Sequence, residues 1–347
     1  MALVTSGSLS DSYQKYFSKM LLERQLPILQ MEQFAVKATL PRKNGNKEIT
    51  FFRYDNPSIS NIVEITSEGT NPGSNERQLT LSTVTGSLKQ YASLVKLSTL
   101  LEATNLFDSL SQATTQLSED HALHADTLVH RILTLNNTDG TGTAGQAAFA
   151  RYAQNGTNST NFIAASAANS AFTALDLLDA TTALRVEKAP TIKGGYVLVA
   201  DPRTARSVLN DDDYIQAHHY NNTDSLLKGE VGTYYGIKTL LSHNVLSFGS
   251  STSTTIGSAG DYNASTRPFL ANIVLGDQAF GVPSLTGDSP YSPKVLISSG
   301  PDKNDPLDLQ TVIALKTYYT SVRLNTAFYR VVFSPVSYTH LTLPTRA

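Results

Sequence analysis

The sequence predicts an α+β protein built from a projecting β-hairpin, one long helix and an α/β second domain. Three observations support this prediction. Neither glycine nor proline occurs between Ser87 and Asp139, which is typical of a long helix and the strand before it. Two strand-like segments flank a polar, proline- and glycine-rich stretch at about residues 55–76. After residue 171, helical and strand-like segments alternate along the chain.

The long helix is predicted at residues 106–135. Its apolar side chains recur at steps of three and four and therefore share one helix face. The first of them are Leu106, Leu110, Ala113 and Leu117. Asn105 and Asp108 are candidate caps for its start, and the polar run 136–140 is a strong stop signal. Such a helix would be about 45 Å long, and its lack of sustained heptads argues against a coiled coil.

Before this helix, the sequence indicates an amphipathic N-terminal arm and a hairpin. The arm covers residues 11–31, and a first strand is expected at 34–40, followed by a basic turn at 41–47. Residues 48–54 are rich in β-branched and aromatic side chains, and residues 78–85 and 87–97 alternate in polarity, so all three segments are predicted strands. A long hairpin that buries little against its own domain is expected to rest on a neighbour.

After the long helix, the pattern favours an α/β domain. Residues 141–170 are predicted to be a loop or loosely packed insertion, and residues 249–265 a surface loop. Helices are expected at 171–187 and after Asp201, which caps a helix with Pro202 in its first position. Strands are expected at 196–200 and 269–275. The Tyr- and Val-rich segments 311–320 and 321–333 are predicted to pair with strand 87–97 beside the long helix.

Composition excludes several classes of protein. The 27 Lys and Arg residues nearly balance the 29 Asp and Glu residues, which gives no electrostatic argument for nucleic acid or an anionic membrane. Cysteine is absent, so disulfides and thiolate metal sites are excluded. No apolar run reaches membrane-spanning length, and the first residues lack the apolar core of a signal peptide. We expect a soluble protein made in a reducing cytosol.

Motifs for catalysis or cofactor binding are incomplete. Residues 140–145 match G-x-G-x-x-G, but a helix precedes them and no acidic residue follows at the required distance. An acidic and histidine cluster on the long helix is more typical of a solvated or interface face than of a metal site. It consists of Glu119, Asp120, His121, His124, Asp126 and His130. Residues 211–213 lack the glycine and glutamate of a calcium loop. We therefore expect no enzyme, no catalytic residue, no cofactor and no metal.

The tail has an unusual sequence. Residues 336–345, V-S-Y-T-H-L-T-L-P-T, reverse-translate to a transposon adapter used in making sequencing libraries. We expect residues 336–347 to be read-through of that adapter, with the native chain continuing differently after about residue 335, and we leave them out of the fold prediction.

With these elements in order, the chain resembles the tailed-phage major capsid proteins of the Hong Kong 97 fold, and most closely the N-four-like family. Seven motifs, spread over residues 10–335, carry the resemblance. They are F-F-R-Y at 51–54, T-S-E-G-T-N-P at 66–72, Q-Y-A-S-L-V-K-L-S at 90–98, Y-V-L-V-A-D-P at 196–202, G-E-V-G-T-Y-Y-G at 229–236, K-N-D-P at 303–306 and K-T-Y-Y-T-S-V-R-L-N at 316–325. The second has one residue inserted relative to the family pattern, and Ala92 replaces a glycine in the third.

The resemblance implies a domain plan and contacts between subunits. The plan is an N-terminal arm (1–47), an extended loop (48–86), a peripheral domain with the spine helix and an insertion (87–188), an axial domain (189–300) and C-terminal strands of the peripheral domain (301–335). Implied inter-subunit residues of the extended loop are Ile62, Val63, Ile65, Glu68, Gly69, Pro72, Leu79 and Leu81. Those of the axial domain are Gly229, Glu230, Gly232 and Tyr234. Residues 54–86 contain no lysine, so the lysine cross-link known for some members is not expected there.

The implied function is a major capsid protein that self-assembles into the icosahedral shell around a phage double-stranded DNA genome. Its implied partners are copies of itself in pentamers and hexamers, scaffolding and portal proteins, and packaged DNA through non-specific contacts, with no membrane. The shell would assemble in the bacterial host cytoplasm and end in the virion capsid. An encapsulin-like nanocompartment shell shares the fold and is the alternative, and a metal-dependent enzyme that uses the acidic and histidine cluster is a distant one.

Overall fold

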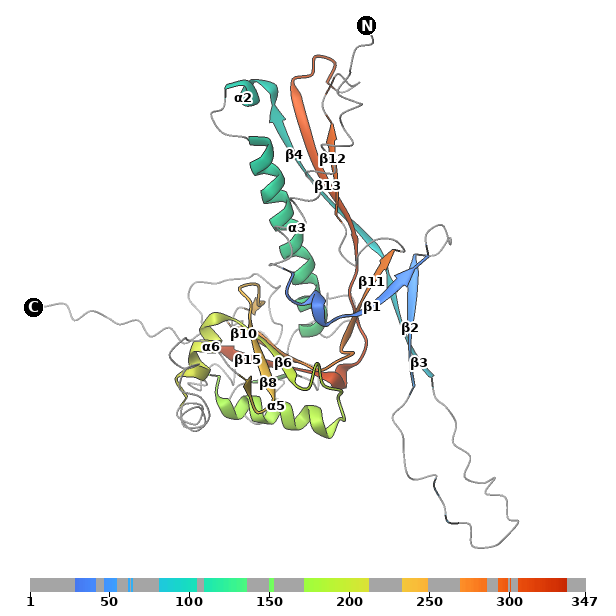
Figure 1. Ribbon diagram of the computed structural model, residues 1–347, viewed down its shortest axis with the longest axis vertical. Coiled ribbons are helices and arrows are strands. Elements are labelled where there is room, and N and C mark those ends of the chain that lie inside the picture. The colour runs from blue at the N-terminus through green and yellow to red at the C-terminus, as the bar shows by residue number, and fades with distance from the viewer. Residues whose placement is uncertain are drawn as a thin grey trace, which may run out of the picture.

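A computed structural model of the chain describes residues 29–41, 47–54, 62, 64, 81–104, 109–135, 150–152, 172–211, 233–248, 269–285, 293–298, 300 and 305–335. The described part combines a long helix, an extended arm of strands and a compact α/β body (Figure 1). None of its helices is both long enough and apolar enough to cross a membrane. This arrangement has the α+β class that the sequence predicts.

The long helix α3 (Ser109–Thr134) lies along a three-stranded antiparallel sheet (Figure 1). The sheet has the order β12 (Lys294–Ser298), β13 (Gln310–Tyr319), β4 (Lys89–Ser98), and β13 pairs with β4 over its whole length. Ala113 and Leu117 of the helix pack on Ile313 and Leu315 of β13 because strand side chains alternate and every second one faces the helix. With 26 residues, α3 is about 39 Å long. A short helix α2 (Thr99–Thr104) precedes it.

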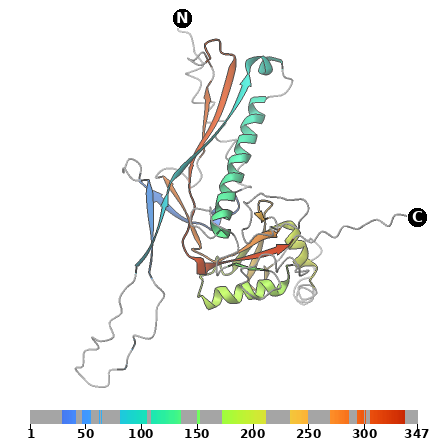
Figure 2. The same cartoon turned by 180° about the vertical axis from the view of Figure 1, so that it is seen from behind.

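A two-stranded hairpin continues this arm of the molecule away from the body (Figures 1 and 2). Strand β2 (Glu48–Tyr54) pairs antiparallel with β3 (Leu81–Ser87), in the register that places Tyr54 opposite Leu81. Because only Leu88 separates β3 from β4, the two strands form nearly one line from the hairpin to the three-stranded sheet.

The compact body is a seven-stranded mixed sheet whose two faces are both covered. Its main path has the order β5 (Ala150–Tyr152), β15 (Tyr329–Pro335), β10 (Phe269–Leu275), β6 (Tyr196–Ala200), β8 (Ile237–Leu241) and β7 (Thr233–Tyr234). Strand β9 (Ser247–Phe248) pairs with the end of β10. All five residues of β6 are buried, as expected for a strand whose apolar run is continuous.

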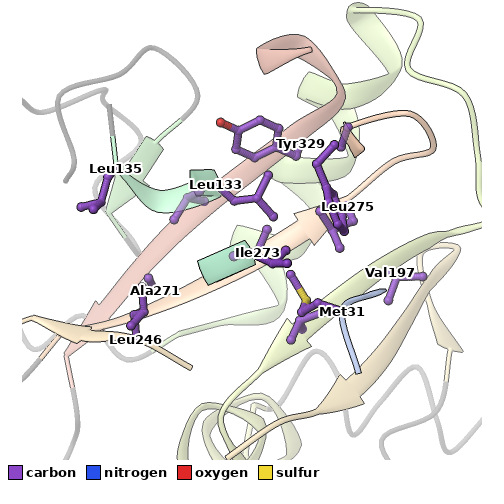
Figure 3. Close-up of a cluster of buried hydrophobic side chains, with 14 of the residues drawn as sticks. Met31, Leu133, Leu135, Val197, Leu246, Ala271, Ile273, Leu275 and Tyr329 are labelled. Carbon is purple, nitrogen blue, oxygen red and sulfur yellow. The ribbon is translucent and has the colours of Figure 1, made fainter. Parts of the chain in front are cut away.

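Each face of this sheet packs on a different helix. Leu198 and Val274 face helix α5 (Ala174–Val186), which covers one side together with α6 (Pro202–Leu209). Ile273 and Val199 face the other side, where the C-terminal half of α3 and Met31 close the core (Figure 3). A further small sheet, with the order β1 (Val36–Leu40), β11 (Phe280–Leu285), β14 (Val322–Arg323), joins the body to the hairpin base. Two 3₁₀ turns, η1 (Glu32–Phe34) and η3 (Thr326–Phe328), complete the described elements.

Most predicted elements are confirmed, with boundaries shifted by a few residues. The caps behave as expected: the Asp201 carboxylate accepts a hydrogen bond from the Arg203 N–H at 2.9 Å, and Pro202 opens α6. The long helix ends at Thr134, one residue before the predicted end, whereas its predicted start at residues 105–108 lies outside the described part. The G-x-G-x-x-G match, the loop 249–265 and the tail 336–347 also lie outside it.

One expectation about strand pairing is wrong. Strand β13 pairs with β4 as predicted, but β15 (Tyr329–Pro335) pairs with β10 at the centre of the seven-stranded sheet. Both segments are rich in Tyr and Val, but β13 alternates between buried and half-buried residues, whereas Val331, Val332 and Phe333 of β15 are all buried, as expected for a strand covered on both faces. Within residues 141–170, expected to be a loop or loosely packed insertion, the described residues 150–152 form the short strand β5, which runs parallel to β15.

Candidate assembly surfaces

One face of the β2–β3 hairpin carries large apolar side chains that nothing in the described part of the chain covers. Phe52 is 67% exposed, Tyr54 64% and Leu81 46%. Residues directly opposite each other in an antiparallel pair point to the same side, so Tyr54 and Leu81, together with Phe52 opposite Thr83, form one surface. We call Phe52, Tyr54 and Leu81 the exposed hairpin face. Apolar side chains gathered in this way on an extended element are typical of a protein interface.

The opposite face of the hairpin anchors it to the body. The Phe51 ring packs directly against Gly281 of β11. A side chain at this position would clash with the ring, because a Cβ added at Gly281 would lie 2.9 Å from Cζ of Phe51. A Cβ added at Gly86 would overlap the side chain of Val322 in β14. Next to these contacts, a groove of about 690 Å³ lies between the hairpin and η3. Its lining combines polar residues such as Arg53, Asp277 and Asn325 with apolar ones, and Phe52 and Tyr54 also border it. The base of the hairpin is therefore held by packing contacts, while about two-thirds of the Phe52 and Tyr54 side chains stays exposed.

A second uncovered surface is the side of the three-stranded sheet that faces away from α3. Leu94 and Leu296, 57% and 51% exposed, flank Ala314 in one row across the three strands. The neighbouring rows on this side carry Lys96, Lys294 and Lys316, and the Lys316 Nζ lies 5.1 Å from the ring centroid of Tyr318. We call this surface the outer sheet face. Its described strand residues include no carboxylate, so it is apolar and positively charged.

Few of the sequence-predicted contact residues can be placed. Ile62 is 78% exposed and Leu81 belongs to the exposed hairpin face. Tyr234 is 8% exposed and packs in the core with α5, and its neighbour Tyr235 is the exposed one of the pair. The remaining predicted residues lie outside the described part: Val63, Ile65, Glu68, Gly69, Pro72, Leu79, Gly229, Glu230 and Gly232.

The acidic and histidine cluster on α3 divides between an internal junction, formed by the buried His121, Asp126 and His130, and an exposed side that carries Asp120 and His124. The Asp126 carboxylate, 1% exposed, accepts hydrogen bonds from the Met31 N–H at 3.2 Å and from the Asn244 side-chain amide at 3.1 Å. Nε2 of His130, also buried, lies 3.9 Å from Asp126. One carboxylate thus joins the N-terminal segment, the long helix and the seven-stranded body.

The other two histidines of the cluster contact β4. Nε2 of His121 lies 2.6 Å from the Ser93 hydroxyl, and the His124 ring packs edge-on against Tyr91 with centroids 4.8 Å apart. Because the side chains turn to separate partners, the described residues contain no group of three carboxylates or imidazoles placed to hold a metal. Nothing in the sequence pattern indicated that Asn244 and Met31 would share Asp126.

Burial sets the protonation of these histidines. Desolvation lowers the pKa of His130 below its usual value, and the nearby Asp126 only partly opposes this shift. Desolvation, and then the neighbouring charge of His124, lowers the pKa of His121. The pKa of His124 is lowered by desolvation and by Arg131. These shifts favour the neutral form of all three imidazoles at pH 7.

At the end of α3, Arg323 of β14 supplies a cap that lies far away in the sequence. Its guanidinium donates a hydrogen bond to the backbone carbonyl of Leu135 at 3.1 Å. A positive charge is favourable here, because the carbonyl end of a helix carries partial negative charge. This contact links the long helix to the small sheet at the hairpin base.

Comparison with known proteins identifies the fold. No protein-family model matches the chain, and no curated protein matches its sequence. Solved structures do match. The capsid of cyanophage P-SCSP1u superposes with a TM-score of 0.60 at 16% identity, covering 88% of this chain and 87% of that one.

Two further phage capsids give similar values. The capsid of Ralstonia phage GP4 has a TM-score of 0.61 at 14% identity, with 88% of each chain covered. The capsid of cyanophage Pam1 has a TM-score of 0.61 at 12% identity, with 86% of this chain and 88% of that one covered. The chain has the Hong Kong 97-type fold of tailed-phage capsid proteins.

Proposed function

We propose that this protein is the major capsid protein of a tailed phage, which assembles from copies of itself into an icosahedral shell. The observation that carries the proposal is the fold, which phage capsid structures share over 86–88% of the chain. The exposed hairpin face adds a physical reason for assembly, since large apolar side chains on an extended element gain stability only when a partner covers them.

The partner proposed for the exposed hairpin face is a second copy of the chain. The hairpin and the outer sheet face lie at opposite ends of the nearly continuous β3–β4 line (Figure 2). Between the start of β3 at Leu81 and the end of β4 at Ser98, a strand rise of about 3.3 Å per residue gives a separation of roughly 55 Å. A hairpin directed away from its own sheet is well placed to lie across the sheet of the next subunit.

Charge complementarity supports this pairing. Residues 55–80, which join the two hairpin strands, contain Asp55, Glu64, Glu68 and Glu76 but only one basic residue, Arg77. The outer sheet face is positively charged through Lys96, Lys294 and Lys316. Opposite charges on facing surfaces speed encounter and suppress wrong registers. We propose that the acidic loop of one subunit lies on the lysines of its neighbour.

Further partners follow from this function as proposals. The shell would need scaffolding and portal proteins, would contact packaged double-stranded DNA without reading its sequence, and would assemble in the bacterial cytoplasm before becoming the virion capsid. We propose no catalysis, because the acidic and histidine cluster is used in packing. We infer placement in the N-four-like family from the sequence motifs.

The proposed function is tested by replacing residues 60–80 with a short Gly-Ser linker. Strands β2 and β3 keep their pairing and their anchoring to β11 and β14, so the variant is expected to fold and melt cooperatively. The full chain, with its scaffold where needed, is expected to form pentamers, hexamers and closed particles. These assemblies are expected to be absent from electron micrographs of the variant. A full chain that stays strictly monomeric with its scaffold present would contradict the capsid function, and normal shells from the variant would contradict the role of the loop.

A further inference from the structure

The base of the hairpin meets the body at a reciprocal interlock of two glycines and two side chains. Gly86 of β3 lies against the side chain of Val322 from β14. Gly281 of β11 lies against the ring of Phe51 from β2. Each partner therefore offers one projecting side chain and one position without a side chain, where β1 and β11 lie beside the hairpin (Figure 1). We call these four residues the hairpin joint.

The strand registers place the two contacts of the hairpin joint next to each other. Val322 and Gly281 are direct partners in the β11–β14 pair. On the hairpin, Gly86 is opposite Ile49, and Phe51 lies two residues further along β2, so the Phe51 ring and the bare side of Gly86 face the same way. Two contacts on one side of the hairpin fix its direction, whereas a single contact would leave it free to pivot.

Packing at the hairpin joint, and not a ladder of backbone hydrogen bonds, sets this direction. Among the described strands, β2 and β3 form a two-stranded sheet of their own, separate from the β1–β11–β14 sheet. Hollows border the joint: a pocket of about 110 Å³ is lined by Gly86 and Val322, and the groove of about 690 Å³ is lined by Phe51. The close contacts are therefore concentrated at these few residues.

Both glycines serve through their missing side chain and not through an unusual backbone conformation. Glycine inside a strand weakens the strand and often marks a close approach of another segment. Neither Gly86 nor Gly281 has the left-handed φ angle that favours glycine. A Cβ at Gly86 would overlap Cγ2 of Val322, which is 4% exposed and, as a β-branched residue, has few alternative rotamers. A side chain at Gly86 would therefore push the hairpin away from the small sheet.

We propose that the hairpin joint sets the direction of the hairpin relative to the body, and with it the angle at which one subunit meets the next. Relief of the overlap at Gly86 needs a shift of about 1.5 Å, which restores a carbon–carbon separation of about 3.5–4.0 Å. Leu81 lies about 17 Å further along β3, so rotation about the Phe51 contact enlarges the shift to several ångström there. The direction of the hairpin is a property of one subunit, and only its effect on the angle between subunits rests on the proposed function.

The direction of the hairpin can be measured in the full-length subunit, at concentrations too low for assembly. The chain contains no cysteine, so Leu81→Cys and Gln112→Cys, on the exposed side of α3, supply two specific spin-label sites. Pulsed electron paramagnetic resonance then gives the distance between the labels. Gly86→Ala is expected to shift the mean distance by several ångström, and adding Val322→Ala, which vacates the space, should reverse the shift. Thr85→Ala, at an exposed neighbouring position of β3, is the matched control and should leave the distance unchanged.

Two variants keep this test decisive, and circular dichroism with thermal melting checks that each is folded. Val322→Ala alone only removes atoms from the joint and is expected to broaden the distribution of label distances. An unchanged mean distance in folded Gly86→Ala, a shift that the double variant does not reverse, or an unchanged width in Val322→Ala would each overturn the proposal. The last of these results holds even where Gly86→Ala does not fold.

Electron microscopy of shells assembled from the unlabelled Gly86→Ala chain tests the consequence for assembly. Shells of altered diameter, or curved sheets that do not close, are expected, and the double variant with Val322→Ala should return the original diameter. Shells of unchanged diameter from a chain whose label distance has shifted would overturn the link between the hairpin direction and the angle between subunits. An unmodified chain that forms no shells contradicts the proposed function, whereas the label distances still decide whether the joint directs the hairpin.

Discussion

Replacing both aromatic residues of the exposed hairpin face is expected to separate folding from assembly. The change is Phe52→Thr together with Tyr54→Thr, and threonine is chosen because it keeps a high strand propensity. Both rings are about two-thirds exposed. The free energy of unfolding of the unassembled subunit should therefore change by no more than about 0.5 kcal/mol, as for other surface positions.

The expected loss in assembly follows from the same exposed fractions. A Phe or Tyr side chain buries roughly 150–250 Å² when fully covered, so two-thirds of each ring leaves about 200–300 Å² available to a neighbour. At about 25 cal/mol per Å² this area is worth roughly 5–7 kcal/mol before ordering costs. If about half of this free energy remains after the ordering costs, the double threonine variant loses about 3 kcal/mol per inter-subunit contact. Its critical concentration for assembly then rises on the order of a hundredfold.

Light scattering across a concentration series, with electron microscopy of the products, measures this effect. The conservative pair Phe52→Leu and Tyr54→Phe keeps most of the apolar area and is expected to assemble nearly as well as the unmodified chain. Assembly of the double threonine variant at the unmodified concentration would refute the reasoning, because the hairpin face would then not be buried in the shell. Loss of cooperative melting would show that these rings belong to the fold of the subunit.

Three further predictions concern the interior and the tail. Asp126→Ala is expected to lower the free energy of unfolding by about 2–3 kcal/mol in denaturant titrations, because the Met31 N–H and the Asn244 amide lose this acceptor. The control Asp120→Ala, on the exposed side of the same helix, should change the free energy of unfolding by less than about 0.5 kcal/mol. Acid is expected to destabilise the protein as pH falls below about 6.5, because His121, His124 and His130 have lowered pKa values in the folded state and the unfolded chain therefore binds more protons. Denaturant titrations at pH 7.5 and 5.5 measure the loss of stability, and an unchanged pH dependence in His130→Leu would count against this cause. Deleting residues 336–347 should leave the melting temperature and solubility unchanged, since β15 ends at Pro335, and a reproducible loss beyond about 1 kcal/mol would mean that the tail contributes to the fold.

Local features of the chain were predictable because each depends on a few neighbouring residues. The buried strand β6, the cap at Asp201 and the long helix follow from an apolar run, a carboxylate before a proline, and a three-to-four-residue spacing. The hairpin was also predictable, since two alternating segments flank a polar connection. Sequence motifs further indicated the capsid fold, which the structural comparisons confirm.

The partners of each strand and the junctions between elements were decided only by the tertiary structure. The segments of β13 and β15 are both rich in Tyr and Val, yet one strand pairs beside α3 and the other at the centre of the body. The polarity pattern of a strand specifies which of its sides are buried and not which strand lies next to it. Asp126 appeared in the sequence as part of a polar cluster on a helix. Its contacts with Met31 and Asn244 join residues 95 and 118 positions apart, and no local pattern encodes such distances. A carboxylate is buried there because two donors from distant segments offset the cost of removing it from water.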